Sequence, residues 1–334
     1  MAASMIPPAA APDFLSANGW GGARIEPLAG DASFRRYFRV IDGARTAVLM
    51  DAPPPHEDPR PFMAIARYLT GIGLAAPAIL AEDLAQGLLL IQDFGGDRMR
   101  EAADADPARE AELYAGVTDV LVALHRHAPP PGLAMHGVEQ WVEEAMLFPD
   151  WYGPAVGLDL CRDSFAAVMR DAMMPVAVAA PPPVTLLRDY HAENIMLIAG
   201  ETGVRHYGLL DFQDALAGHP GYDLVSILED ARRDVSPAIE TAMIARYCAA
   251  TGAGDDFRRA YWALGAQRNI RILGVFCRLW KRDNKPHYRS FQPRMWGLLE
   301  RNLAQPGLAG LRDWFDAHVP ARYRAAAWDG AVSA

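Results

Sequence analysis

The sequence of 334 residues predicts an α+β fold with a small β-rich N-terminal lobe and a larger helical C-terminal lobe. One observation is a series of short strand-like runs between residues 24 and 93. Another is the change to helical spacing of apolar residues from Pro107 onward. Apolar residues make up 51% of the chain, enough for two cores. We therefore expect lobes at residues 1–93 and 94–334.

The N-terminal lobe is expected to contain five strands and one helix. Residues 1–12, rich in alanine and proline, are interpreted as a loose arm. The helix is expected at 61–70, where apolar residues share one face. The strands are expected at residues 24–28, 34–41, 45–51, 79–83 and 88–91.

The dipeptide Asp42-Gly43 predicts a hairpin between the second and third strands. A two-residue turn there places Arg35 opposite Met50 and Arg36 opposite Leu49. By the alternation of side chains, Arg39 shares the face of Arg35, and we expect it to be solvated.

The C-terminal lobe is expected to be mainly helical, with three short strands around two acidic segments. The strands are expected at 183–187, 195–198 and 207–210. The helices are expected at residues 108–126, 140–147, 159–173, 222–232, 238–251, 257–281 and 293–303.

Composition excludes several classes of partner. The formal net charge of −9 argues against nucleic acid, because no excess of cations exists to neutralise phosphates. No long uncharged apolar run and no signal-peptide pattern are visible, so we expect a cytoplasmic protein that needs no membrane. Three widely spaced cysteines fit a reducing compartment. We expect a monomer that acts on a small molecule.

The pattern Asp189, Asn194 and Asp211 predicts phosphoryl transfer. Asn194 follows Asp189 by five residues, and Asp211 ends a later apolar strand. In this chemistry one Asp accepts the proton of the attacking hydroxyl, while Asn and the second Asp hold Mg²⁺ on the phosphates of ATP. We assign catalysis to Asp189 and the metal to Asn194 and Asp211. His191 is interpreted either as a second candidate base or as a residue that shapes the loop.

Three further segments are candidates for binding the nucleotide. The turn of small residues Gly30, Asp31, Ala32 and Ser33 would let backbone N–H groups approach phosphates. Gln92 and Asp93 begin a connector whose backbone would meet the adenine edge. Arg35 or Arg36 would supply the cation for the phosphates, because the only lysines, Lys281 and Lys285, lie far along the chain.

Residues after the second acidic segment are candidates for the substrate and for loop support. Asp230, Arg232 and Arg233 follow the predicted metal site closely and are interpreted as substrate contacts. Asp223 lies at a predicted helix start, where its charge favours the helix N-terminus.

Together these residues resemble the aminoglycoside phosphotransferase/choline kinase superfamily, which has a protein-kinase-like fold. The resemblance extends from about Gly30 to Trp296. Longer strings resemble the branch of anomeric kinases for N-acetylmuramate and N-acetylglucosamine, in which the sugar C1 hydroxyl is phosphorylated during cell-wall sugar recycling. These strings cover residues 30–39, 48–54, 188–191, 211–215, 222–226 and 230–234.

Two positions depart from the superfamily pattern. Leu187 stands where the superfamily usually has His, two residues before the catalytic Asp. Met50 stands near the place of the third-strand Lys that contacts nucleotide phosphates. Two alternatives stay open beside the amino-sugar kinase: a kinase of another small alcohol, such as an aminoglycoside or choline, and a nucleotide-binding pseudokinase.

Overall fold

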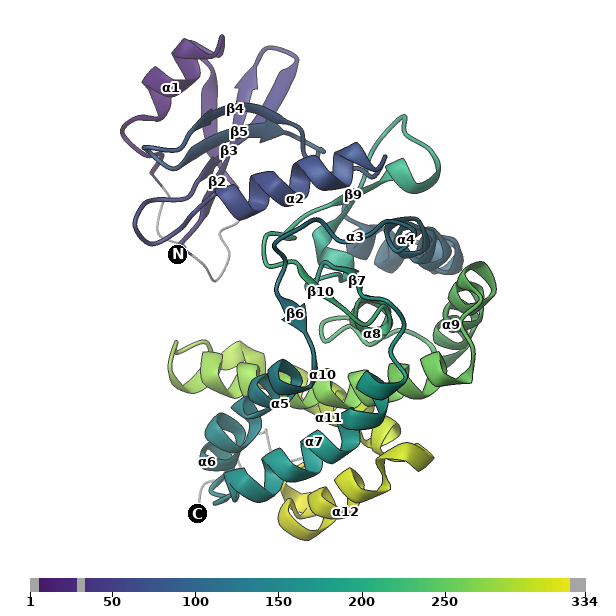
Figure 1. The fold of residues 1–334 in the computed structure, drawn as a ribbon. Helices are drawn as coiled ribbons and strands as arrows, with labels where there is room; N and C mark the ends of the chain where they lie inside the picture. Colours follow the sequence, from purple (N-terminus) through teal and green to yellow (C-terminus); the bar gives the residue numbers. More distant parts are fainter. Residues whose placement is uncertain (1–5, 29–33, 325–334) are drawn as a thin grey trace. The chain divides into compact units, whose positions relative to one another are not determined.

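A five-stranded antiparallel sheet, in the order β1-β2-β3-β5-β4, forms the N-terminal part of the protein (Figure 1). The structure is a computed structural model, and it describes residues 6–28 and 34–324. All five predicted strands are confirmed. They are β1 (Arg24–Pro27), β2 (Arg36–Asp42), β3 (Arg45–Asp51), β4 (Ile79–Asp83) and β5 (Leu88–Gln92).

Helices cover both faces of this sheet. The predicted helix is confirmed as α2 (Arg60–Gly71), which buries Phe62, Ile65 and Leu69. Helix α1 (Ala11–Ala17) packs Phe14 and Leu15 against inward-facing residues of β2, β3 and β5. The prediction of a loose arm over residues 1–12 is therefore wrong for its last two residues, because α1 begins at Ala11. So short a helix is stabilised by burying its apolar side chains on the sheet, and the local sequence pattern does not indicate that contact.

The register of the β2–β3 hairpin differs from the prediction by two residues. Asp42 pairs with Arg45, so the turn is Gly43-Ala44 rather than Asp42-Gly43. Gly43 adopts φ 58°, the left-handed conformation that glycine tolerates best. Arg36 consequently lies opposite Asp51, a carboxylate, instead of Leu49.

The chain divides into two compact units that are built from non-contiguous segments. One unit joins residues 1–124 to 193–215, and the other joins 125–192 to 216–334. The sheet ends at Gln92 of β5, and the boundary after residue 93 stays a prediction. The first unit also contains α3 (Met99–Ala105), η1 (Pro107–Arg109), α4 (Glu110–Leu124), β8 (Ile195–Leu197), η4 (Gly203–His206) and β9 (Tyr207–Leu209).

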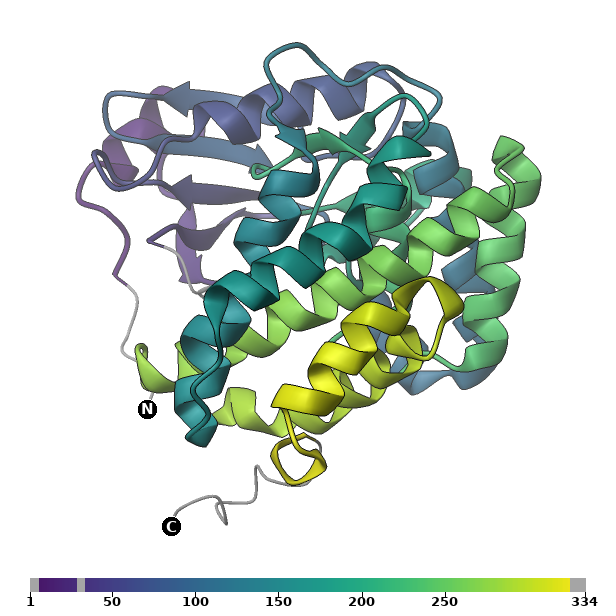
Figure 2. The same ribbon diagram turned by 60° about the horizontal axis from the view of Figure 1, so that its bottom comes forward.

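The second unit is helical and is organised around the long helix α10 (Asp255–Lys281). Helix α10 packs against α5, α7, α8 and α11 (Figure 2). The surrounding helices are α5 (Val138–Ala145), α6 (Gly153–Val156), α7 (Arg162–Val178), α8 (Gly221–Leu228), α9 (Pro237–Thr251), α11 (Gln292–Leu303) and α12 (Ala309–His318). Shorter helical turns are η2 (Phe148–Tyr152), η5 (Pro286–Phe291), η6 (Pro306–Leu308) and η7 (Ala321–Tyr323).

The second unit also holds a small sheet in which β10 (Leu216–Gly218) lies between β6 (Met135–His136) and β7 (Val184–Leu186). The helix predicted at 222–232 is wrong at its C-terminal end, since α8 stops at Leu228. The chain leaves the helix there because the carboxylate of Asp230 accepts from the backbone N–H groups of Ala192 and Arg232, which are not part of α8. In residues 6–28 and 34–324 no helix has the length and apolarity to cross a membrane.

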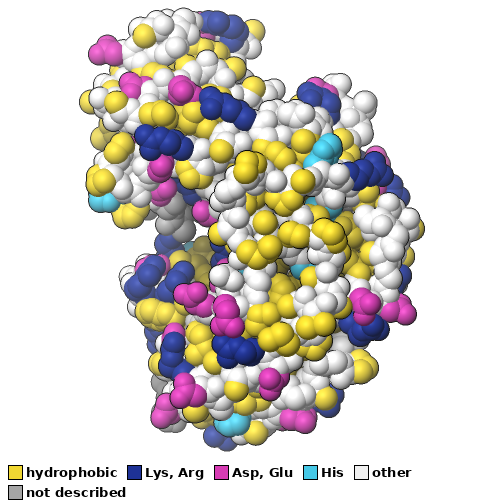
Figure 3. All heavy atoms as spheres, in the orientation of Figure 1, with side chains coloured by type: hydrophobic (Ala, Val, Ile, Leu, Met, Phe, Trp, Pro, Cys, Tyr) yellow, Lys and Arg dark blue, Asp and Glu magenta, His cyan; other side chains and the backbone are white. Residues whose placement is uncertain are grey.

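Acidic and basic side chains are interspersed on the face of the molecule shown in Figure 3. This face therefore carries no large area of a single charge.

Candidate active site

The loop that carries Asp189 is held by a buried carboxylate of helix α8. Strand β7 is buried, and the loop begins at Leu187 directly after it. The backbone N–H groups of Leu187 and Arg188 donate to the two carboxylate oxygens of Asp223, at 2.6 and 2.9 Å. Arg188 adopts φ 66°, a conformation that costs energy for a non-glycine residue and that the two bonds hold in place. The Ser226 hydroxyl adds a bond to the Arg188 carbonyl at 3.2 Å.

Asp223 is completely buried, and burial raises its pKa to about 7. The two backbone N–H donors and the charge of Arg268 act in the opposite direction, and Asp189 adds repulsion that raises the pKa further. The loop is therefore supported although Leu187 stands in place of His, because Asp223 accepts from the backbone N–H groups of both Leu187 and Arg188.

The far end of the same loop is tied to Asp230 and Arg232. Asp230 is 1% exposed; one oxygen accepts from the Ala192 N–H at 3.3 Å and the other from the Arg232 N–H at 2.8 Å. The Arg232 guanidinium lies 3.4 Å from Nε2 of His191, which is also buried. The structure thus brings His191, Asp230 and Arg232 together around the loop that carries Asp189.

A cluster of charges surrounds the side chain of Arg188. Its guanidinium lies 2.6 Å from Glu144, which also contacts Arg271 at 3.5 Å and His136 at 3.3 Å. Burial acts to raise the pKa of Glu144, but the hydrogen bond from His136 and the two arginines outweigh it and lower that pKa to about 2. Glu144 is therefore ionised at neutral pH and neutralises charge on Arg188 and Arg271.

In the first unit, Asn194 and Asp211 lie at one end of a two-stranded ladder. Strands β8 and β9 are antiparallel, with Ile195 opposite Leu209. The Leu210 N–H continues this ladder with a 3.0 Å bond to the Asn194 carbonyl. Asp211 then adopts φ 58°, and its carboxylate accepts from the Gln213 amide at 2.8 Å. The structure confirms both predicted strands and places the two predicted metal ligands at neighbouring positions.

Arg35 faces two carboxylates at the same place. Its Nη2 lies 3.9 Å from Oδ1 of Asp211, and its Nε lies 3.8 Å from Oε2 of Glu57. Only 12% of the Arg35 side chain is exposed. Phe212, next to Asp211, is buried and stacks on Phe62 of α2 with ring centroids 5.0 Å apart. The packing of Phe212 fixes the start of the segment that follows Asp211.

Arg36 has a different environment. It donates to Asp51 from Nε at 2.8 Å and to the Ile6 carbonyl at 3.1 Å. The Asp51 side chain is only 3% exposed, so Arg36 neutralises a buried carboxylate. Met50 is fully buried, and it therefore presents no group to solvent at the place of the third-strand Lys.

The connector after β5 is braced by its own side chains. Arg39 binds Asp93 at 2.8 Å and the Gly95 carbonyl at 2.7 Å. The prediction that Arg39 is solvated is wrong, because its strand face is covered by the connector. The exposed Gln92 is hydrogen-bonded through its side-chain oxygen to the Ala78 N–H at 3.4 Å. The predicted phosphate turn at Gly30, Asp31, Ala32 and Ser33 lies outside the described residues.

The chemistry of Asn194 and Asp211 fits a magnesium ion. An amide oxygen and a carboxylate are the hard oxygen donors that Mg²⁺ prefers, and Mg²⁺ usually completes its shell with water and phosphate oxygens. In the part of the chain that the structure describes, no group of three or more His, Cys, Asp or Glu side chains forms a transition-metal site. The donor set therefore favours a metal that binds together with a phosphate ligand.

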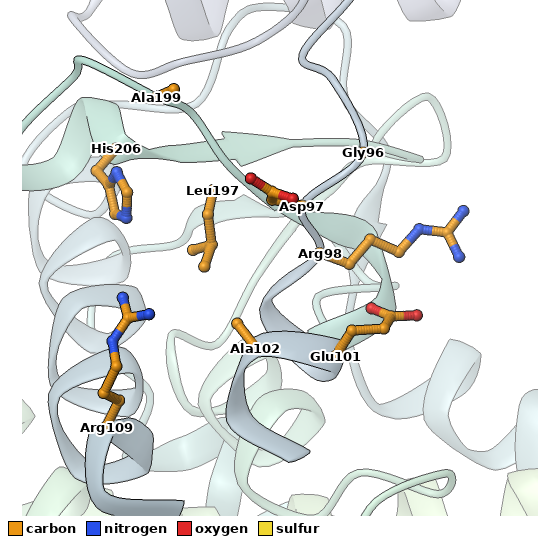
Figure 4. A pocket seen from close by; sticks show the side chains of 9 residues that line it. All are labelled: Gly96, Asp97, Arg98, Glu101, Ala102, Arg109, Leu197, Ala199 and His206. Atoms are coloured by element: carbon orange, nitrogen blue, oxygen red, sulfur yellow. The ribbon is translucent and has the colours of Figure 1, made fainter. Parts of the chain in front are cut away.

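Each unit has a pocket of its own apart from these residues. A pocket of about 400 Å³ in the first unit is lined by both acidic and basic side chains, and Figure 4 shows Arg98 pointing away from Arg109 and His206 there. A pocket of about 580 Å³ in the second unit is lined by His125, His219 and Tyr247 among others. Burial lowers the pKa of His125 to about 3 and that of His219 to about 4, so both are neutral. None of the predicted site residues that the structure describes lines either pocket.

Sequence reasoning missed two side chains that support the site. The sequence predicts only that Asp223 favours its helix N-terminus; Asp223 does lie in the first turn of α8, but it also binds the loop 36 residues earlier. Glu57 carried no signal, because it follows a run of prolines outside any periodic element. A buried Asp in an otherwise apolar helix was the one available clue for Asp223.

Comparisons with known sequences find relatives of this chain. A profile described as "Phosphotransferase enzyme family" matches residues 24–262. An N-acetylmuramate/N-acetylglucosamine kinase of Caulobacter vibrioides is 38% identical, and the match covers 93% of this chain and 96% of that protein. A protein of the same name from Pseudomonas aeruginosa is 37% identical over 90% of this chain and 91% of its own length.

Solved structures with the same fold are kinases of small molecules. A choline/ethanolamine kinase family protein from Mesorhizobium loti superposes with a TM-score of 0.61 at 14% identity, covering 88% of this chain and 92% of that one. The ADP-bound aminoglycoside phosphotransferase APH(2'')-Ib gives a TM-score of 0.59 at 12% identity, with 86% and 96% covered. The predicted α+β, kinase-like fold class is confirmed.

Proposed function

This chain belongs to the phosphotransferase enzyme family, as its resemblance predicted, and we propose that it transfers the γ-phosphoryl group of ATP to the C1 hydroxyl of N-acetylmuramate, N-acetylglucosamine or both. The observation that carries the proposal is the 38% identity, over 93% of the chain, to a kinase named for these two sugars. The site residues support it, because each group that phosphoryl transfer requires has a counterpart here.

We assign the role of base to Asp189. Its carboxylate would orient the sugar hydroxyl and accept its proton as the phosphoryl group is transferred. Asp223 and Asp230 support this role by binding backbone N–H groups at the two ends of the loop. Such anchoring keeps a catalytic group in the geometry that transfer requires.

Asn194 and Asp211 would hold Mg²⁺. When bound, the ion neutralises charge on the phosphate oxygens. The chain's own contribution is to keep the two oxygen ligands adjacent on the β8–β9 ladder, where the Gln213 amide orients the Asp211 carboxylate.

Arg35, rather than Arg36, is the better candidate for contacting phosphate. Arg35 lies beside the metal ligand Asp211 and is oriented by Glu57, whereas Arg36 binds a buried carboxylate in the sheet. A guanidinium can grip phosphate oxygens bidentately, so an arginine can take over the function of the missing lysine. The lobe 1–93, with the turn at residues 30–33 and the connector at Gln92, stays our proposal for the nucleotide site.

We place this reaction in cell-wall sugar recycling and expect a cytoplasmic monomer. Sedimentation at several concentrations tests the oligomeric state. A concentration-dependent shift to a larger species would overturn this expectation.

Proton-coupled ³¹P NMR of the product tests the proposed reaction. Phosphate on C1 couples to one proton and gives a doublet, whereas phosphate on C6 couples to two protons and gives a triplet. The methyl glycoside of N-acetylglucosamine, whose anomeric oxygen is blocked, should not react. A triplet, or turnover of the glycoside, would refute phosphorylation at C1. ATP binding without turnover on either sugar, on aminoglycosides or on choline would identify a pseudokinase.

Variants at two nearby aspartates test the assignment of the base. Asp189→Ala should lower kcat by about 10²- to 10⁴-fold while the Kd for ATP, measured by calorimetry, stays within about twofold. Asp214→Asn is the matched control, because Asp214 lies in the second acidic segment but is exposed. Near-normal turnover in Asp189→Ala would remove Asp189 from the mechanism.

A further inference from the structure

Arg268 carries a positive charge inside the second unit. It lies in the middle of α10 and is only 5% exposed. Burying a charged group costs free energy, because the group loses its hydration, unless other interactions offset the loss. Burial lowers the pKa of Arg268, and the negative charges of Asp230 and Asp189 act in the opposite direction. Asp189 is the proposed base and Asp230 binds the end of its loop, so the buried charge and the loop stabilise each other.

A chain of hydrogen bonds leads from Arg268 to the start of the loop that carries Asp189. Its Nη2 donates to the Ser226 hydroxyl at 2.9 Å, and that hydroxyl donates to the Arg188 carbonyl at 3.2 Å. The Arg188 N–H donates to Asp223 at 2.9 Å, so Arg188 is held through the peptide groups on both of its sides. Such contacts maintain the left-handed φ of 66° that Arg188 adopts.

A second hydrogen bond leads from Arg268 to the far end of the same loop. Its Nη1 donates to the Glu229 carbonyl at 3.2 Å. The next residue, Asp230, accepts from the Ala192 N–H at 3.3 Å. A single side chain of α10 therefore connects the segment before Asp189 to the segment after it.

The charge of Arg268 acts on the loop, because its hydrogen bonds go to a hydroxyl and a carbonyl, which are neutral acceptors. Arg271, three residues later on the same helix, instead contacts the ionised Glu144 at 3.5 Å. Burial raises the pKa of Asp223, repulsion by Asp189 adds to that effect, and Arg268 acts to lower the pKa. An ionised Asp223 accepts from the loop with both oxygens, and a charged acceptor forms stronger hydrogen bonds than a neutral one. Arg268 thus supports the loop by its charge as well as by its hydrogen bonds.

We propose that Arg268 is a positioning residue for phosphoryl transfer, which connects α10 to both ends of the loop that carries Asp189. This inference rests on the proposed function, in which Asp189 is the base. Arg268 acts through Ser226, Glu229 and Asp223, all of which belong to the second unit. It therefore affects the rate of transfer and leaves the binding of ATP and of either sugar unchanged.

The positioning depends on pH through Asp223. Burial raises the pKa of Asp223 to about 7, and Asp189 from the loop and Arg268 from α10 act on it with opposite signs. Tyr247 of α9 also interacts with Asp223, but burial raises the pKa of Tyr247, so this phenol is neutral near pH 7. Without the positive charge of Arg268 the pKa of Asp223 rises further. Loss of Arg268 should therefore move the decline of kcat on the acid side to higher pH.

The test measures kcat, KM and the pH dependence of kcat for both sugars. Arg268→Met should lower kcat by about 10- to 100-fold and change each KM by less than about threefold. The midpoint of the decline on the acid side should rise by about one pH unit. Arg268→Lys keeps the charge and should restore the midpoint, with a kcat between those of the other two proteins. In Asp223→Asn, which lacks the titrating group, the addition of Arg268→Met should shift no midpoint.

Two further variants separate positioning from a general loss of structure. Ser226→Ala keeps the charge of Arg268 and removes its link to the Arg188 carbonyl, so kcat should fall by about 3- to 10-fold at an unchanged midpoint. This variant tests the inference even if Arg268→Met does not fold. Gly274→Ala disturbs the packing of the same helix against Leu147, and it should leave the kcat of the folded fraction and the midpoint unchanged.

The outcomes distinguish this inference from a merely structural role. A loss of kcat in Arg268→Met without a shift of the midpoint, or an equal loss in Gly274→Ala, would overturn the inference. An unchanged kcat in Ser226→Ala would do the same. No turnover of either sugar by the unsubstituted protein would instead overturn the proposed function itself.

Discussion

Replacing Asp223 by Asn tests how the catalytic loop is held. The side chain keeps its shape, but its NH₂ group replaces one of the two oxygens that accept hydrogen bonds. This NH₂ group would then face the backbone N–H of Leu187 or Arg188, and two donors cannot form a hydrogen bond with each other. One donor is left unsatisfied inside the protein. We expect the loop to shift and kcat to fall by about tenfold or more, with ATP affinity unchanged.

The pH dependence of stability supplies a second measure of the same residue. Because burial raises the pKa of Asp223 from 3.8 to about 7, the folded state holds a proton that the unfolded state has released. The resulting stability is complete below pH 4 and is lost as pH rises through 7. At 1.36 kcal/mol per pKa unit the full effect is about 4 kcal/mol, of which about 2 to 3 kcal/mol falls between pH 5 and 8.

Urea unfolding of both proteins at pH 5, 6, 7 and 8 measures this effect. The free energy of unfolding of the wild type minus that of Asp223→Asn should decrease by about 2 to 3 kcal/mol across the series. The subtraction cancels other buried acids, such as Glu229, whose pKa burial also raises to about 7. Asp234→Asn is the control, since Asp234 is largely exposed and should show no such decrease. A difference that does not change with pH, or an unchanged kcat in Asp223→Asn, would refute the reasoning.

Two further predictions concern the frameworks of the two units. Arg36→Gln should leave the buried Asp51 carboxylate without its counter-charge and lower the free energy of unfolding by about 3 to 5 kcal/mol. The KM for ATP of the folded fraction should be unchanged. A raised KM without loss of stability would make Arg36 the phosphate ligand instead. Gly274→Ala should destabilise by about 1 to 3 kcal/mol, because its Cβ would lie 2.3 Å from the Leu147 backbone. Gly297→Ala is the control, because a Cβ at this helical position would meet no other atom, and it should raise the free energy of unfolding by about 0.4 to 1 kcal/mol in the same chemical denaturation series. Equal effects of the two substitutions would contradict the packing of α10 against Leu147.

Local patterns were sufficient for much of the fold. Strand alternation and turn residues predicted all five strands of the N-terminal sheet, and helical spacing predicted α2 and most helices of the second unit, because these signals depend on neighbours a few residues apart. Helix α3, whose residues 99–105 are mostly polar or small, and α12 near the C-terminus were missed. Each of these helices buries only a few apolar side chains, and such a short apolar face is recognised only when the elements that it packs against are known.

Sequence reasoning alone was sufficient to propose Asp189, Asn194 and Asp211 as residues of the candidate site. The spacing of Asp189, Asn194 and Asp211 is a local feature, because it reflects which residue types phosphoryl transfer requires along one stretch of chain. The tertiary structure decided their support. It assigned Arg36 to Asp51 and Arg35 to Glu57, a distinction that a two-residue change in hairpin register was enough to hide.

The same holds for the loop of Asp189, where Leu187 replaces the usual His. What holds the loop is the carboxylate of Asp223, and what ties its end to Arg232 is the carboxylate of Asp230. Every residue except proline has a backbone N–H group, so the type of the donating residue does not indicate that it forms such a hydrogen bond. Such contacts join positions about 35 to 40 residues apart, and only the folded chain brings them within 3 Å or so.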